Sequence, residues 1–180
     1  WRVFGGYFPD YDESMAAFQV APTFRYGSRM KRFEDDYMYD ELLIGRTGTG
    51  NIWAQQTYKS NGNFKVISGI GGTSDWLTAV NLQTPIHPDV PFRIFGDFGT
   101  NANSWDGFEF EEEVKVAYDA GFALVLAEDF FEVYYPFLYS DNFNSYFDNK
   151  DWHEAILFRL NLKAINLMQI RKDLQGLMSN

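Results

Sequence analysis

Residues 113–126 read EVKVAYDAGFALVL, and polarity alternates along most of this stretch. Side chains of a β-strand point to opposite faces in turn, so the stretch divides into two rows. One row is apolar and includes Tyr118 and Phe122. The other row combines Gly and Ala with Lys115 and Asp119. A period of two over this length predicts a β-strand with two chemically different faces.

The same division recurs in PFRIFGDFG (91–99), WLTAVNLQTP (76–85) and AILFRLNL (155–162). Each stretch has one aromatic and aliphatic row and one row that mixes small or polar residues with single charges. A row facing water on a soluble sheet usually carries many long polar side chains, whereas small residues with single charges suit the interior of a narrow barrel. Charges there must pair. We therefore predict an interior charge network of Arg93, Asp97, Lys115, Asp119 and Arg159.

Strand-like runs fill most of the chain and are separated by Gly, Asn, Asp and Pro clusters. They cover residues 2–8, 16–26, 52–58, 63–68, 76–84, 92–99, 109–126, 130–138 and 154–162. This pattern predicts an all-β protein, an antiparallel up-and-down barrel of about eight strands over residues 1–162. Leucine and isoleucine at helical spacing predict a short amphipathic C-terminal helix in residues 163–180, and residues 35–44 fit a short helix or a loop.

Composition narrows the class of protein. The chain has 180 residues, which suits one domain, and 46% are hydrophobic, which argues against disorder. Aromatic residues make up 19%, which favours strands. The net charge of −10 excludes nucleic acid as a partner, because nothing would neutralise a phosphate backbone. No apolar run is long enough for a membrane-spanning helix.

Two orientations of the strands remain open from alternation alone. In an outer-membrane barrel the apolar rows face lipid, and Trp and Tyr gather at the strand ends as an aromatic girdle. The predicted girdle residues are Trp76, Trp105, Tyr134, Tyr135, Tyr139 and Trp152. In the alternative, a soluble lipocalin-like barrel, the aromatic rows face inward and line a pocket for an apolar small molecule.

The dipeptide His153-Glu154 resembles the opening of the zinc-binding motif H-E-x-x-H, but the fourth following position is Leu157. The other histidine, His87, lies between prolines, and the chain has no cysteine. We interpret the HEAILF stretch as the start of a strand. The sequence predicts no metal site, no cofactor and no catalytic constellation. The acidic runs in 34–41 and 109–113 are interpreted as solvated faces, and Ca²⁺ binding through their carboxylate oxygens remains the alternative.

Six stretches together resemble a known family: DYMYDELLIGR, DWLTAVNLQTPI, FRIFGDFGT, YDAGFALVL, FFEVYYPFLYSDNF and EAILFRLNLKAINL. They are similar, in order from about residue 36 to about residue 170, to the C-terminal β-barrel-like region of large bacterial gluzincin (thermolysin-clan) aminopeptidase-like outer-membrane proteins. The resemblance implies that a zinc metallopeptidase domain would lie upstream, outside this chain. No catalytic residue carries over. The chain departs from many membrane barrels by ending in QGLMSN instead of an aromatic residue.

The expected function is therefore structural. We expect a non-catalytic barrel in the bacterial outer membrane that serves as a membrane anchor or as a subunit of a membrane assembly. Its partners would be the lipid bilayer and other outer-membrane or periplasmic subunits. The soluble barrel with an apolar ligand remains the alternative.

Overall fold

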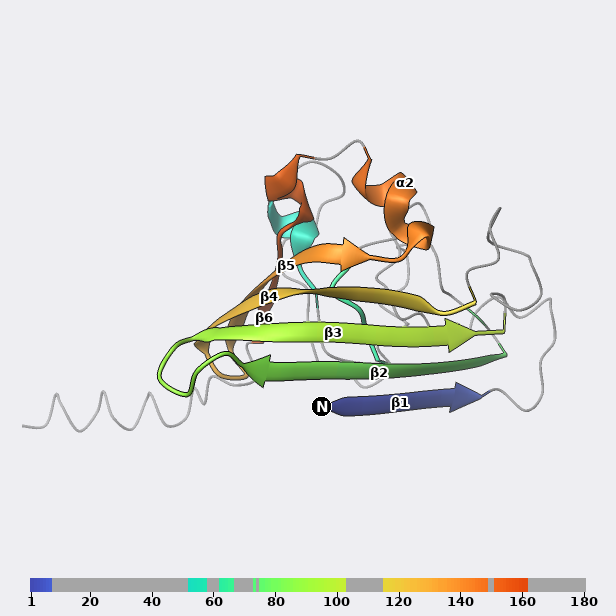
Figure 1. The fold of residues 1–180 in the computed structure, drawn as a ribbon, viewed down its shortest axis with the longest axis horizontal. Helices are drawn as coiled ribbons and strands as arrows, with labels where there is room; N and C mark the ends of the chain where they lie inside the picture. The colour runs from blue at the N-terminus through green and yellow to red at the C-terminus, as the bar shows by residue number, and fades with distance from the viewer. Residues whose placement is uncertain are drawn as a thin grey trace, which may run out of the picture.

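The computed structural model describes residues 1–7, 52–57, 62–66, 73, 75–102, 115–148 and 151–161. These residues form a six-stranded antiparallel sheet in which neighbouring strands follow one another in the chain (Figure 1). The strands are β1 (Arg2–Tyr7), β2 (Trp76–Pro85), β3 (Phe92–Asn101), β4 (Ala117–Ala127), β5 (Phe131–Tyr139) and β6 (Leu157–Leu160). The sheet curves into a half-barrel, which confirms the predicted antiparallel all-β class.

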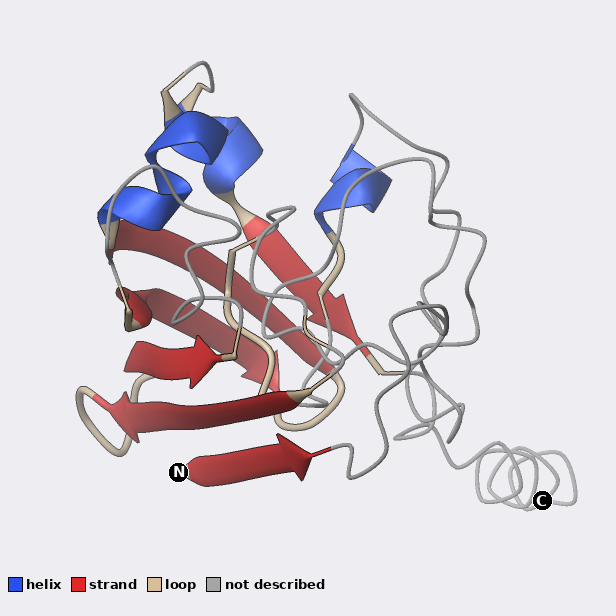
Figure 2. Ribbon diagram, turned by 90° about the vertical axis from the view of Figure 1, so that its right-hand side faces the viewer, coloured by secondary structure: helices blue, strands red, loops and turns tan. Residues whose placement is uncertain are grey.

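The described helices are short and lie beyond β5, on the side of the sheet away from β1 (Figures 1 and 2). They are the 3-10 turns η2 (Ile52–Gln55), η3 (Asp141–Phe143) and η4 (Trp152–Ala155), and the single turn α2 (Asn144–Phe147). The predicted run 16–26, the predicted element 35–44 and the predicted C-terminal helix in 163–180 lie outside the described residues.

Three predicted strands need correction. Residues 52–58 begin as η2, and only Gln56 forms a bridge, with Phe158 of β6. Residues 63–66 form no strand, because the backbone N–H of Lys65 donates to carboxylates of the sheet instead of to a neighbouring strand. The last predicted strand begins only at Leu157, three residues later than expected.

The late start of β6 has a local cause. Asp151 and Glu154 form a capping box around η4: the Asp151 side chain accepts from the Glu154 backbone, and the Glu154 carboxylate accepts from the Asp151 N–H at 3.2 Å. This reciprocal pair favours a helical turn over an extended chain. His153-Glu154 therefore belongs to a capped turn, and the interpretation of HEAILF as the start of a strand is wrong for its first residues.

The pairing register separates the strand residues into a concave and a convex row. Every charged residue in the six strands lies at a concave position. These residues are Arg2, Arg93, Asp97, Asp119, Glu132 and Arg159. The convex positions of these strands hold no Asp, Glu, Lys or Arg. Large apolar side chains are exposed there instead: Val3, Tyr7, Leu82, Phe92, Ile94, Phe98, Phe122, Leu126, Tyr135, Phe137 and Leu138.

The concave side is filled by the chain itself. Residues 62–66 are buried against it, and Phe64 joins an apolar cluster with Leu77 and Phe143. A second cluster contains Phe95, Ala123, Tyr134 and Leu157. Residue 62 has to be glycine, because its φ is +69° and a Cβ would lie 2.6 Å from the Ala79 Cβ.

A bulge in β5 accompanies a second close contact of the half-barrel, between β4 and β5. The register of β4 and β5 shifts between Ala120 and Gly121, and bulges increase the local bend of a sheet. A Cβ on Gly121 would lie 2.1 Å from the Tyr135 carbonyl oxygen and 2.8 Å from the Phe95 ring. Gly121 therefore lets β5 and the Phe95 ring approach β4 closely.

We predict that Gly121→Ala lowers the free energy of unfolding by about 1–3 kcal/mol, because the backbone of β5 must move to relieve the overlap. The matched control is Gly5→Ala on the convex side of β1, where nothing lies within 4 Å of the added Cβ. Equilibrium unfolding of the two variants measures the difference. An equal effect at the two positions would contradict the close approach of β4 and β5.

Candidate functional site

A row of polar side chains crosses the concave face. The register places Arg2, Asn81, Asp97 and Asp119 opposite one another on β1 to β4. We call these four residues the polar row. Each lies at a concave position of its strand, so strand alternation alone brings the four side chains together. The Arg2 Nε donates to Asn81 Oδ1 at 3.1 Å, and the Asn81 amide donates to Asp97 Oδ1 at 2.8 Å.

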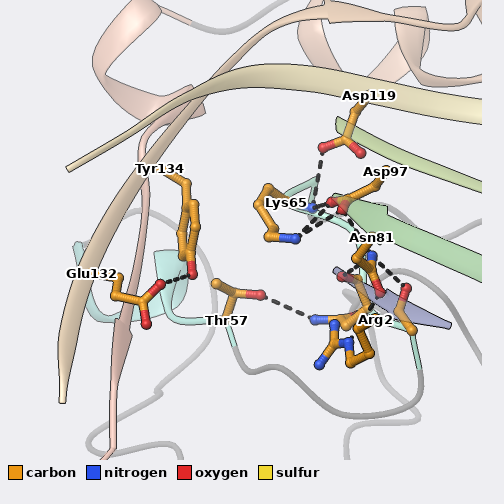
Figure 3. Close-up of polar contacts among 10 residues, drawn as sticks. Arg2, Thr57, Lys65, Asn81, Asp97, Asp119, Glu132 and Tyr134 are labelled. Carbon is orange, nitrogen blue, oxygen red and sulfur yellow. Dashed lines mark hydrogen bonds and ion pairs between the residues drawn. The ribbon is translucent and has the colours of Figure 1, made fainter. Parts of the chain in front are cut away.

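Lys65 lies against the centre of this row (Figure 3). Its ammonium donates to both carboxylate oxygens of Asp97, at 2.9 and 2.8 Å. Its backbone N–H donates to Asp97 Oδ2 and to Asp119 Oδ2, at 3.1 Å each. Lys65 retains 4% of its accessible surface and both aspartates retain none. This is a fully desolvated ion pair with a second carboxyl group beside it.

The two carboxyl groups cannot both be ionised at low cost. Burial raises the pKa of Asp119 well above its usual range, and the neighbouring Asp97 charge raises it further, while Lys65 acts in the opposite direction. Asp97 holds the Lys65 ammonium through two contacts, whereas Asp119 contacts only the Lys65 backbone N–H. The raised pKa favours the protonated form of Asp119, as expected when like charges share a buried site.

A second buried ion pair, with a tyrosine hydroxyl beside it, lies at the other end of the concave face. Arg159 of β6 donates to Glu132 of β5 at 3.0 Å, and the Tyr134 hydroxyl donates to the other oxygen of Glu132. Burial, followed by the Glu132 charge, raises the pKa of Tyr134 well above its usual value. Tyr134 is therefore a neutral hydrogen-bond donor, and the carboxylate of Glu132 is satisfied on both oxygens.

Two aromatic rings connect these clusters. The Lys65 ammonium lies 5.5 Å from the centre of the Phe95 ring and 5.6 Å from that of Tyr134. The two rings meet edge to face with centroids 5.7 Å apart. A cation within about 6 Å of an aromatic ring is attracted by the ring quadrupole, most strongly when desolvated. The rings therefore stabilise the ammonium on the side away from the polar row.

The structure separates the residues of the predicted interior network. Asp97 and Asp119 meet in the polar row, whereas Arg159 is buried with Glu132. Arg93 is half-buried and pairs at 3.1 Å with exposed Glu128 beyond the end of β4. Lys115 precedes β4 and is exposed.

Sequence reasoning missed Lys65, Asn81 and Glu132 as partners. Asn81 and Glu132 had a usable signal, because each is the polar member of an alternating strand. Lys65 had no usable signal, because residues 63–68 were interpreted as a further strand.

The residues of the predicted aromatic girdle also lie in different environments. Trp76 and Tyr135 lie at convex positions, and the register places Trp76 opposite Tyr7. Tyr134 is buried on the concave face and does not contribute to a convex girdle. The remaining three differ in place: Tyr139 stacks on Phe147 with centroids 4.0 Å apart, Trp152 is exposed in η4, and Trp105 lies outside the described residues.

The concave clusters have the chemistry of a structural site. Their carboxyl groups are buried and bound to the protein's own cations, so a substrate would have to displace Lys65 or Arg159 to reach them. Within the described ranges, no three His, Asp or Glu side chains are grouped so that they would hold a metal ion.

In the part of the chain that the structure describes, no helix has the length and hydropathy needed to cross a membrane.

Comparison with protein families, curated proteins and solved structures finds no match to this chain. The resemblance to gluzincin aminopeptidase-like proteins therefore stays a prediction from the sequence.

We predict that Asp97→Ala and Arg159→Ala each lower the free energy of unfolding by about 3–5 kcal/mol, because each leaves a buried charge uncompensated. Arg93→Ala is the control. Its partner Glu128 keeps 71% of its side-chain surface, and an exposed pair contributes about 0–1 kcal/mol. Chemical denaturation measures all three. Losses below about 1 kcal/mol for both buried positions would refute the buried-pair assignment.

Asp119→Asn should make the stability of the protein less sensitive to rising pH. The raised pKa means that the folded state holds a proton that the unfolded state releases, so wild-type stability falls as pH rises from about 4, the ordinary Asp value, through the raised folded-state pKa. The asparagine variant lacks this proton and lacks that decline.

The measurement is the difference in unfolding free energy between wild type and Asp119→Asn across pH. It should shift in favour of the variant as pH rises. A difference that is independent of pH would show that Asp119 titrates normally.

Proposed function

We propose that this chain is part of an outer-membrane-type β-barrel whose convex face contacts lipid. In this proposal it acts as a non-catalytic membrane anchor or as a subunit of a membrane assembly in the bacterial outer membrane. The observation that carries the proposal is the separation of polarity across the sheet. In the described strands the charged residues are concave, and the convex rows carry no charge and expose most of their large apolar side chains.

A sheet in water shows the opposite distribution, with its apolar face covered and its polar face solvated. Contiguous exposed apolar surface of this kind marks contact with a membrane or with another protein. Here it extends across the strands, from Val3 on β1 to Phe137 on β5. Lipid contact explains why no convex strand position carries a charge, because a charge in the bilayer core is costly.

Strand length supports the same proposal. Strands β2 to β5 have 10, 10, 11 and 9 residues. A transmembrane strand needs about 9–11 residues at its usual tilt. The convex positions of β4 are apolar from Tyr118 to Leu126, almost its full length, which fits an apolar band about 25 Å tall.

The paired charges on the concave side suit a barrel interior. A narrow interior excludes bulk water, so ionised groups there need partners from the protein. Asp97 with Lys65, and Glu132 with Arg159, meet this requirement. We propose that the half-barrel belongs to a closed barrel of about eight strands.

The resemblance stated from the sequence would place a zinc metallopeptidase domain upstream of such a barrel. Any peptidase activity would then belong to that domain, with this chain as its anchor. The soluble barrel with an apolar ligand is less well supported, because the aromatic rows are largely convex and the concave side is filled by residues such as Phe64 and Lys65.

Phe122→Lys tests lipid contact at the centre of β4. In bilayers we expect a loss of about 2–4 kcal/mol in unfolding free energy, the cost of a lysine at the bilayer midplane. The control is Leu126→Lys near the end of β4, which should cost only about 0–1 kcal/mol close to the interface. Both positions are exposed, at 46% and 59%, so on a solvated face both substitutions would stay within about 0.5 kcal/mol.

Equal small effects of the two lysines in lipid vesicles would contradict lipid contact. So would a wild-type protein that stays soluble and monomeric without detergent. If it stays soluble but forms a defined oligomer, the convex face is instead a contact between protein subunits.

A further inference from the structure

We propose that the concave face carries a binding site for a primary alkylammonium group, and that Lys65 occupies this site from within the same chain. The site consists of the Asp97 carboxylate on one side and the rings of Phe95 and Tyr134 on the other. Asp119 lies beside it and accepts from the backbone N–H of Lys65. This proposal goes beyond the membrane anchor and does not depend on it, because it concerns the concave side alone.

The walls of the site and its occupant come from different parts of the chain. Asp97 and Phe95 belong to β3, Asp119 to β4 and Tyr134 to β5. Their places are set by strand pairing and by the edge-to-face contact of the two rings. Lys65 enters from segment 62–66, which is not a strand of this sheet. The sheet therefore supplies the site, and the segment supplies an ammonium ligand.

The chemistry of the walls selects an ammonium with N–H donors on a slender apolar stem. Both oxygens of Asp97 accept from the ammonium, at 2.9 and 2.8 Å. The two rings face it at cation–π distance. Asp119 is fully buried, and its Oδ1 has no hydrogen-bond partner among the described residues. Lys65 therefore leaves one buried carboxyl oxygen of Asp119 without a hydrogen bond in the described part of the chain.

Segment 62–66 has anchors that do not involve the Lys65 side chain. The Asn81 amide donates to the carbonyl oxygens of Gly62 and Asn63, at 3.1 and 3.2 Å. The Lys65 backbone N–H is held by Asp97 and Asp119. Removing only the side chain would therefore leave the backbone in place and open a cavity with the shape and charge preference of an alkylammonium ion.

The experiment is rescue of Lys65→Ala by n-propylammonium, whose three carbons and nitrogen replace Cγ, Cδ, Cε and Nζ. We expect Lys65→Ala to be strongly destabilised, since Asp97 loses its counter-ion. Added n-propylammonium should restore folding with saturable dependence. The folding equilibrium constant should rise about tenfold at an amine concentration ten times the dissociation constant. If the variant does not fold without amine, the folded yield on refolding with amine is the readout.

Matched controls separate the site from a general effect of amines. Two ligands should fail to rescue Lys65→Ala: 1-propanol, which lacks the charge, and tetramethylammonium, which lacks N–H donors. Two proteins should not respond to n-propylammonium: wild type, whose site is filled, and Lys65→Ala combined with Asp97→Asn. Lys65→Met, which fills the cavity with an uncharged chain, should not respond either.

Three results would overturn the proposal. The first is a Lys65→Ala variant that gains no folded protein at any amine concentration that leaves wild type intact. The second is a Lys65→Ala variant as stable as wild type without amine. The third is an equal response to 1-propanol and n-propylammonium, which would show that the cavity only needs to be filled.

Discussion

The ion pair between Lys65 and Asp97 is the interaction on which the concave side of this protein depends. Both groups are withdrawn from water, and a charge without a partner there would be costly. The pair attaches segment 62–66 to the centre of the sheet, where the segment buries Phe64 against β2 and η3. Burial and the neighbouring Asp97 charge then raise the pKa of Asp119, which favours its protonated form beside a single ammonium.

The same constraint explains the distribution of polarity over the sheet. Once the concave side holds the charges of the strands, alternation directs the intervening apolar residues to the convex side. Exposed apolar surface of that extent marks contact with a membrane or with another protein. We propose lipid, because lipid contact would also account for strands of about ten residues. The paired interior and the uncharged exterior are therefore two consequences of one alternating pattern.

A sequence pattern predicts structure only over the number of residues that the pattern spans. Alternation has a period of two, so it placed Asp97, Asp119 and Arg159 on one face of their strands before any pairing was known. It could not supply Lys65, because the contact with Asp97 spans 32 residues and no periodic pattern records it.

Two other features that the sequence did not predict have local causes. In the pair Tyr134–Tyr135, alternation allows either ring to face inward, and the pairing with β4 and β6 decides it. The capping box of η4 opens on Asp151, whereas the usual sequence signature opens on Ser or Thr, so the pair Asp151 and Glu154 gave only a weak signal for a helical turn.

The most direct test of the central claim, that the convex face contacts lipid, is a spin-label scan along the convex positions of β4, using single cysteines in a chain that has none. Lipid contact predicts that labels at Phe122 and Leu124, near the middle of β4, collide readily with oxygen and rarely with a water-soluble nickel chelate in reconstituted bilayers. Ready collision with the nickel chelate at these positions would contradict it.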